Sequence, residues 1–126
     1  MALDATSALG AMTGARFIES LRDNREVWLD GERVQDVTTH PALSGMVHEL
    51  ARIYDLQVSG EYKDEMTFIS PETGNHCSLS WLLPRSLDDL KKKRRNSELW
   101  NEQSWGQLGR SPDILAPHII TLYNTK

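Results

Sequence analysis

The Asp30-Gly31 pair is the sequence feature that most restricts how this chain folds. It lies in residues 26–34, where apolar and polar side chains alternate on both sides of the pair. Aspartate and glycine tolerate the positive φ angles of a two-residue turn, and such a turn joins antiparallel strands. The segment therefore predicts a short β-hairpin.

A second hairpin is predicted further along the chain. Residues 71–74, Pro-Glu-Thr-Gly, have the composition of a four-residue turn. Alternating side chains flank this turn, and they are Met66, Phe68 and Ser70 on one arm and Cys77, Leu79 and Trp81 on the other. Because Cys77 alternates with core-type positions, we interpret it as a small buried apolar residue and not as a nucleophile.

Apolar side chains at helical spacing predict two helices in the first half of the chain. The first runs from an N-cap at Thr13 to about Asn24. The second covers residues 41–54, with Pro41 at its first position. One face of this second helix is expected to be buried, and its residues are Leu43, Met46, Val47, Leu50, Ile53 and Tyr54.

A long third helix is predicted after Ser86, which forms a capping box with Asp89. It is expected to end at Gly106 or Gly109 and carries five consecutive cations at residues 91–95. Successive side chains turn by about 100° around a helix, so at least one cation must lean toward the rest of the protein or a partner. The run is either a solvated face or a contact for an anion, such as a nucleotide phosphate or an acidic subunit.

A fourth helix is predicted to start with Ser111 as its cap and Pro112 at its first position. We expect Pro117 to break this helix in its second turn. The fold class that follows is α+β, mainly helical with two short β-hairpins. At 126 residues the chain has the length of one modest domain.

Composition narrows the classes of function. The net charge is -4, and the 25% of charged residues are of both signs and interspersed, so there is no broad basic face for nucleic acid. No apolar run has the length of a membrane span, and residues 1–11 lack the basic residues of an export signal. Cys77 is the only cysteine, and no spacing typical of metal ligands is present. We therefore expect a cytoplasmic protein that holds no metal.

The most distinctive candidate for a binding group is Arg110, which stands on glycine-rich backbone between the last two predicted helices. Its permanently charged, planar guanidinium suits an oxyanion, a carboxylate or an electron-rich ring. Arginines at helix ends also commonly bond the last carbonyls or face water, and both interpretations stay open at this stage. His40 and His48 have no adjacent titratable partner, so for His40 a capping or turn role is favoured over that of a catalytic base.

Taken in order, these segments resemble the N-terminal region of the 4-hydroxyphenylacetate 3-hydroxylase family, the large component of two-component flavin monooxygenases. The matching segments keep the family's order and spacing, and they are residues 12–14, 17–23, 27–34, 36–41, 51–56, 70–74, 88–90 and 109–113. The resemblance extends over residues 12–114, nearly the whole chain.

The resemblance implies a fold like that of acyl-CoA dehydrogenases, in which a helical N-terminal domain precedes a central β domain and a C-terminal helical domain that forms a tetramer. It divides this chain into a flexible N-terminus at 1–11, the N-terminal helical domain at 12–116 and a divergent C-terminal tail at 117–126, as in a truncated reading frame. Family members hydroxylate a phenol beside its hydroxyl group with oxygen and reduced FAD. The implied partners are a phenolic substrate, a separate flavin reductase and further copies of the chain.

Two site assignments follow from the resemblance. Arg110 corresponds to an arginine that faces the substrate phenol and the flavin. Ile114 stands where the family often has a tyrosine that helps to bind the phenol, and isoleucine offers only packing, so a different substrate is expected. The residues that complete the arginine motif are Gly109, Ser111, Pro112 and Asp113. The flavin-binding residues are unknown and are expected mostly beyond this chain.

Because the later domains are missing, we expect the isolated chain to lack hydroxylase activity and to expose apolar surface at Trp100 and Trp105. A free-standing interaction or oligomerisation module is an alternative function. A second alternative is a lyase like 4-hydroxybutyryl-CoA dehydratase, from the same superfamily. Such a lyase needs cysteines for an iron–sulfur cluster near the same helix end, where this chain has Gln103 and Gln107, and amides cannot replace thiolates.

Overall fold

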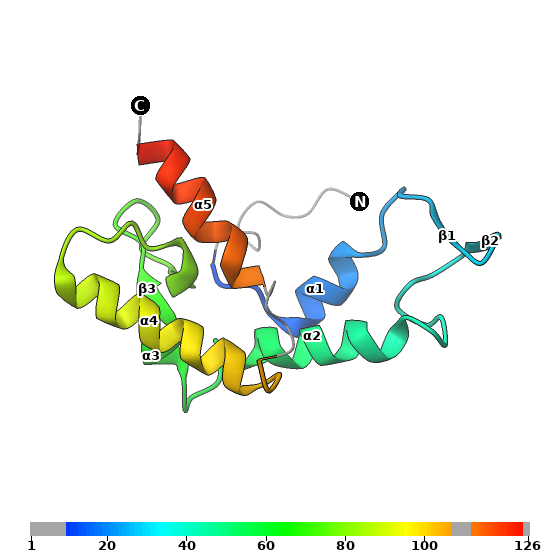
Figure 1. Ribbon diagram of the computed structural model, residues 1–126, viewed down its shortest axis with the longest axis horizontal. Helices are drawn as coiled ribbons and strands as arrows, with labels where there is room; N and C mark the ends of the chain where they lie inside the picture. Colours follow the sequence, from blue (N-terminus) through cyan, green and yellow to red (C-terminus); the bar gives the residue numbers. More distant parts are fainter. Residues whose placement is uncertain (1–9, 107–111, 125–126) are drawn as a thin grey trace. The chain divides into compact units, whose positions relative to one another are not determined.

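A computed structural model describes residues 10–106 and 112–124 of the chain. The chain divides into two compact units, which we call the N-terminal unit, Met12–Leu56, and the C-terminal unit, Gln57–Lys126 together with Met1–Ala11. Helices predominate in both, and each unit contains one two-stranded antiparallel sheet (Figure 1). The predicted mainly helical α+β class with two hairpins is confirmed.

Helix α1, Gly14–Ser20, opens the N-terminal unit. Its N-cap is Thr13, as predicted, and the Thr13 hydroxyl accepts a hydrogen bond from the amide of Arg16 at 3.2 Å. The helix ends before the predicted limit at Asn24. The carboxylate of Asp23 accepts the amide of Arg25 at 3.0 Å, and a local bond of this kind favours a turn over further helix.

The first hairpin pairs β1, Val27–Leu29, with β2, Glu32–Val34. Asp30 and Gly31 have φ angles of 51° and 83°. Two successive positive φ angles are the signature of the tight turn that matches the twist of antiparallel strands. The hairpin predicted from the Asp-Gly pair is therefore confirmed.

Helix α2, Ser44–Leu56, begins later than the predicted start because the residues before it form hydrogen-bonded turns. The carboxylate of Asp36 accepts the amide of Thr38 at 2.7 Å and its hydroxyl at 2.6 Å. Nδ1 of His40 accepts the amide of Ala42 at 3.2 Å. The turn role favoured for His40 is confirmed, and the start of the helix moves by three residues.

Helix α1 packs against α2 at very close range within the N-terminal unit (Figure 1). The amide of Gly14 donates to Oδ1 of Asp55 at 2.7 Å. A Cβ atom on Gly14 would lie 2.4 Å from the carbonyl oxygen of Ala51, far inside van der Waals contact. The rings of Phe17 and Tyr54 extend the contact, with centroids 5.0 Å apart, and burial raises the pKa of Tyr54.

The buried face of α2 agrees only in part with the predicted one. Val47 and Ile53 are buried as expected, and Ala51 is buried with them. Met46 is 55% exposed, so its assignment to the buried face was wrong. The covering helix α1 has seven residues and meets α2 near Ala51 and Asp55, which leaves the first turn of α2 without a cover from α1.

The C-terminal unit begins with helix α3, Lys63–Met66, followed by β3, Thr67–Ile69, and β4, His76–Ser78. The second predicted hairpin is confirmed, with Gly74 at a φ of 71° in its turn. Its arms are shorter than the alternating pattern indicates. Met66 ends α3, and Leu79–Trp81 forms the 3-10 helix η1, while Cys77 is half-buried.

A hydroxyl links the first helix of this unit to its hairpin. Oγ1 of Thr67 donates to the carbonyl oxygen of Lys63 at 2.6 Å. The same oxygen lies 3.0 Å from Nδ1 of His76 on the opposite strand. Thr67 is buried, so α3, β3 and β4 share one polar contact inside the unit.

Helix α4, Leu87–Glu102, is capped by Ser86, whose hydroxyl accepts the amide of Asp89 at 3.1 Å. The carboxylate of Asp89 returns to the amide of Arg85 at 2.9 Å. These bonds, the Arg85 amide first, lower the pKa of Asp89. The predicted capping box is present, with its return bond one residue before the cap. Trp100 is only 2% exposed, so the expectation of an exposed Trp100 was wrong.

The cationic run of α4 contains one side chain that leans into the protein, as the helical geometry predicts. Nζ of Lys93 donates to the carbonyl oxygens of Ser80 at 2.7 Å and Leu82 at 3.0 Å. These carbonyls lie in and just after η1. Lys93 therefore fastens α4 to η1 and is not part of a solvated charge face.

Helix α5, Pro112–Asn124, continues through Pro117, so the expectation that this proline ends the helix was wrong. A proline inside a helix removes one hydrogen bond and crowds one carbonyl. Here α5 contacts η1, and Ala116, one residue before the proline, has no exposed surface. Packing of the helix against η1 offsets the local cost. Across the residues that the structure describes, no helix combines the length and apolar character needed to cross a bilayer.

Candidate functional site

The predicted site lies where α4 ends and α5 begins. After α4 the chain turns sharply, with Trp105 at a φ of 54° and Gly106 at 74°, and the amide of Gly106 donates to the carbonyl oxygen of Asn101 at 3.1 Å. This arrangement closes a helix with left-handed residues, which is the usual role of a glycine at that position. Gly106 thus ends the helical run near where it was predicted.

The central residues of the arginine motif fall outside the described part of the chain. These residues are Gly109, Arg110 and Ser111. Pro112 takes the first position of α5, as predicted from its missing N–H group. Asp113 and Ile114 follow in the first turn, and their side chains lie outside the described residues. The roles of Arg110 and Ile114 stay predictions.

Two side chains beside the motif have clear surroundings. Trp105 is 92% exposed, in line with the expected exposure. Gln103 is the C-cap residue of α4, and Gln107 lies outside the described residues. A fully exposed indole next to the arginine motif is an unusual surface feature for a residue with positive φ.

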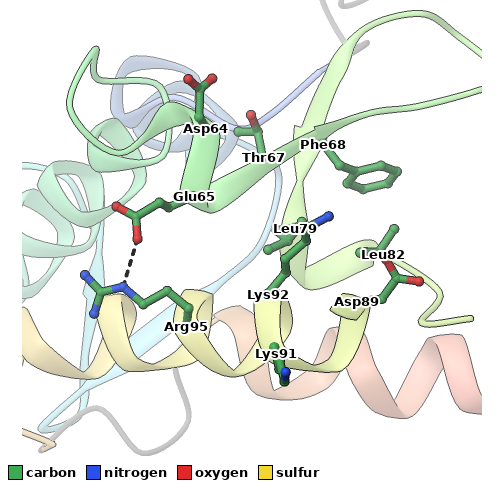
Figure 2. A pocket seen from close by; sticks show the side chains of 10 residues that line it. All are labelled: Asp64, Glu65, Thr67, Phe68, Leu79, Leu82, Asp89, Lys91, Lys92 and Arg95. Atoms are coloured by element: carbon green, nitrogen blue, oxygen red, sulfur yellow. Dashed lines mark hydrogen bonds and ion pairs between the residues drawn. The ribbon is translucent and has the colours of Figure 1, made fainter. Parts of the chain in front are cut away.

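The structure also contains a cleft that the sequence did not reveal. Its volume is about 580 Å³, and it lies between α3, β3, η1 and the first half of α4 (Figure 2). Besides Thr67, its lining combines three carboxylates, three cations and three apolar side chains, which are Asp64, Glu65, Asp89, Lys91, Lys92, Arg95, Phe68, Leu79 and Leu82. Residues 55–64 were expected to be a connecting loop, and no local pattern signals that α3 faces a helix 30 residues later.

The charges of the cleft are largely committed to one another. Nε of Arg95 donates to Glu65 at 2.8 Å, the contact drawn in Figure 2, and Arg95 also lies 3.4 Å from Glu102. Lys92 pairs with Asp88 at 2.8 Å. These ion pairs raise the pKa values of Arg95 and Lys92, with the side-chain hydrogen bond as the main cause in each case. The cations here neutralise neighbouring carboxylates.

A bound flavin does not suit this cleft. The diphosphate of FAD carries negative charge and would meet Asp64, Glu65 and Asp89 on the cleft wall. The three cations opposite are matched in number by these acids. We therefore assign no FAD contact to the cleft, and no step of a reaction is derived through it.

The histidines considered as catalytic bases are placed elsewhere. His40 is engaged in the turn before α2, and His48 is exposed on α2. Within residues 10–106 and 112–124, no group of three histidine, cysteine, aspartate or glutamate side chains gathers as ligands for a metal ion.

The order of helices and hairpins, together with the motif between α4 and α5, matches one protein family. The family model described as "4-hydroxyphenylacetate 3-hydroxylase N terminal" aligns with residues 13–126. The chain belongs to the 4-hydroxyphenylacetate 3-hydroxylase family by this N-terminal region.

Individual relatives are oxygenases that act on phenols. The chain is 41% identical over 106 residues to the 4-hydroxyphenylacetate 3-monooxygenase oxygenase component of Thermus thermophilus, covering 83% of this chain and 22% of that protein. It is 40% identical over 100 residues to the 4-nitrophenol 4-monooxygenase/4-nitrocatechol 2-monooxygenase oxygenase component of Rhodococcus opacus, covering 79% of this chain and 19% of the relative.

A solved structure matches the fold as well as the sequence. The crystal structure of a 4-hydroxyphenylacetate 3-monooxygenase oxygenase component complexed with FAD and 4-hydroxyphenylacetate has a TM-score of 0.78 and 40% identity. The alignment covers 83% of this chain and 22% of the solved chain. The chain thus spans about a fifth of the length of the relatives it matches.

Proposed function

We propose that this chain forms the N-terminal portion of a two-component flavin monooxygenase that hydroxylates a phenol beside its existing hydroxyl group, with reduced FAD and oxygen. The observation that carries the proposal is the family match over residues 13–126, which includes the arginine motif. Because the chain spans about a fifth of its relatives' length, the activity belongs to the whole protein. The 126 residues alone are expected to be inactive.

In this proposal Arg110 binds the oxygen of the substrate phenol. A guanidinium hydrogen bond to that oxygen favours phenolate character, which raises the electron density of the ring that attacks oxygen. A hydrogen bond with one charged partner contributes about 1.5 to 3 kcal/mol. If the whole amount is realised in the transition state, the rate rises by roughly one to two powers of ten. FAD, when bound, supplies the activation of oxygen.

The substrate class is a phenol like 4-hydroxyphenylacetate, with a pocket that differs at Ile114. An isoleucine packs against an apolar ring edge but cannot donate a hydrogen bond to the phenol. The relatives named for 4-nitrophenol and 4-hydroxyphenylacetate share a substituent opposite the hydroxyl group. We infer a para-substituted phenol whose recognition depends on Arg110 and not on residue 114.

The remaining assignments complete the proposal. Residues 12–116 form the N-terminal domain of an acyl-CoA dehydrogenase-like fold, and the whole protein is a homotetramer. A separate reductase supplies reduced FAD by diffusion. The lone cysteine, Cys77, fits a cytoplasmic location, where thiols stay reduced.

The proposal is tested by exchange into a relative. Residues 13–126 replace the matched region of the Thermus thermophilus oxygenase component, and product formation from 4-hydroxyphenylacetate is measured with reduced FAD and oxygen. We expect hydroxylation beside the phenol hydroxyl group. A chimera that folds and binds FAD but hydroxylates none of a panel of para-substituted phenols would contradict the proposed substrate class.

Within the same chimera, Arg110→Lys tests the role of the arginine. Lysine keeps the charge but loses the planar fork, so we expect turnover to fall by roughly tenfold to a hundredfold with little change in thermal stability. Arg94→Lys is the matched control, because the Arg94 side chain is 83% exposed and pairs with Glu98 on the helix surface. Equal turnover of the two variants would remove Arg110 from the site.

A further inference from the structure

Helix α5 exposes an apolar stripe along its length. Leu115 is 65% exposed, Ile119 52%, Leu122 70% and Tyr123 74%. With about 100° of rotation per residue, these four side chains fall within an arc of about 100° on one side of the helix. The stripe is continuous and does not consist of scattered single residues.

The stripe adjoins the buried side of the same helix. Ala116, which has no exposed surface, follows Tyr123 directly around the helix axis. His118 and Thr121 lie on the remaining arc, and the Thr121 hydroxyl bonds the carbonyl oxygen of Pro117 at 2.8 Å. Helix α5 therefore has an apolar surface of which only one part is covered by contacts such as those with η1.

The stripe contains no charge that would oppose its burial. From Leu115 to Asn124 the sequence has no aspartate, glutamate, lysine or arginine. A two-fold axis through Ile119 superposes the stripe on itself in the antiparallel sense. Leu115 of one copy then meets Tyr123 of the partner subunit, so no polar or charged side chain of the stripe is left facing an apolar one.

We propose that two copies of this chain associate through the exposed stripe of α5, with the two helices antiparallel and Ile119 at the symmetry axis. The association is a property of the 126-residue chain and does not depend on the proposed hydroxylation. Contiguous apolar surface of this kind on a helix marks an interaction site in soluble proteins. A second copy is an occupant whose surface is complementary by symmetry.

The size of the stripe predicts a reversible dimer. Four side chains that each offer on the order of 100 Å² give roughly 400 Å² per subunit. A standard stable interface buries about 800 Å² per partner. The α5 pair therefore belongs with small interfaces that dissociate on dilution.

Sedimentation velocity of the full chain over a dilution series tests the proposal. The unmodified chain is expected to change from dimer to monomer on dilution. Ile119→Lys places two ammonium groups together at the symmetry axis and is expected to weaken association by about 100-fold or more. Circular dichroism checks that the variant keeps its helices, since Ile119 is half exposed and its replacement removes little core.

Ile69→Lys is the matched control. Ile69 is 63% exposed on β3, in the same unit, and does not belong to the stripe. This variant is expected to associate like the unmodified chain. A monomeric unmodified chain at high concentration, or equal weakening by both substitutions, would overturn the proposal, as would a monomer that binds a hydrophobic dye at the stripe.

A covalent test gives the orientation of the helices. In a Cys77→Ser background, Ile119→Cys is expected to yield a disulfide-linked dimer on mild oxidation, because packed helices 8 to 10 Å apart bring facing Cα atoms within about the 4.4 to 6.8 Å that a disulfide spans. Ile69→Cys in the same background is expected to stay monomeric on a denaturing gel. If the Ile119→Cys variant sediments as a dimer but forms no crosslink, the antiparallel arrangement is overturned.

Discussion

The N-terminal unit and the C-terminal unit hold their helices in different ways. In the N-terminal unit, α1 and α2 approach so closely that the missing side chain of Gly14 sets the distance, with Ala51 and Asp55 directly opposite. In the C-terminal unit, α4 is attached to η1 by the long side chain of Lys93. The first contact is between backbones, and the second spans a gap with a flexible amine.

This difference teaches where each unit tolerates change. A backbone contact has no adjustable atoms, so any added volume must separate the helices. A lysine side chain can move with its helix and keep its hydrogen bonds. The half-covered helix α5 extends the same trend, since it contacts η1 while leaving a stripe of apolar side chains exposed.

The largest expected effect breaks the backbone contact. In Gly14→Ala the new Cβ would lie 2.4 Å from the carbonyl oxygen of Ala51 and 2.6 Å from Oδ2 of Asp55. We expect the free energy of unfolding to fall by about 2 to 3 kcal/mol. Chemical denaturation followed by the helical circular dichroism signal measures the change.

Gly45→Ala is the control for this prediction, because Gly45 lies in α2 and a Cβ there meets no atom within 4 Å. Alanine is the better helix former, so this variant is expected to gain about 0.5 to 1 kcal/mol. Opposite signs for the two substitutions would support the close contact. A loss at both positions would mean that helix propensity, and not the α1–α2 distance, is responsible.

A smaller effect is expected where the contact is an amine. Lys93→Met keeps the stem of the side chain but leaves the carbonyl oxygens of Ser80 and Leu82 without the Lys93 donor. We expect a loss of about 1 kcal/mol in the free energy of unfolding. Lys91→Met removes an exposed lysine from the same helix and should leave stability within about 0.5 kcal/mol of the unmodified chain.

The smallest effect concerns the turn before α2 and depends on pH. The hydroxyl and then the amide of Thr38, followed by the charge of Arg22, lower the pKa of Asp36. A lowered pKa in the folded state means that this carboxylate stabilises the fold above the unfolded pKa of about 3.9. The contribution is lost as the pH falls through the lower folded value.

Carboxyl NMR titration measures this shift. In Thr38→Val the Asp36 midpoint is expected to rise toward that of an ordinary aspartate. Asp23, whose pKa is lowered to about 2 chiefly by its hydrogen bond with Arg25, serves as the reference in the same spectra and should not move. An unchanged Asp36 midpoint would assign the shift to Arg22 instead.

Much of this architecture follows from local sequence signals. The Asp30-Gly31 turn, the Thr13 cap and the Ser86 cap each satisfy hydrogen bonds within a few residues, so their patterns are readable without the rest of the protein. The inward lean of Lys93 follows from helical geometry alone. Only its partners, 11 and 13 residues away, needed the structure.

The errors arose where tertiary contacts override a local rule. Pro117 breaks an isolated helix, but the packing of α5 keeps it helical. Trp100 was expected to be exposed because no partner element is evident from its neighbours in sequence, and it is buried. For the arginine motif, the sequence predicts a planar cation beside a helix start. What Arg110 contacts depends on atoms that a fifth of the family length does not include.

The contact between Thr67 and His76 determines how the second hairpin responds to acid. The Thr67 hydroxyl has one proton, which it gives to Lys63, so Nδ1 of His76 must be the donor in their 3.0 Å contact. A ring with its proton on Nδ1 keeps this bond after Nε2 is also protonated. At His40 the same atom accepts from Ala42, so protonation of that ring removes its acceptor. Acid therefore opens the turn before α2 and leaves the Thr67 contact intact.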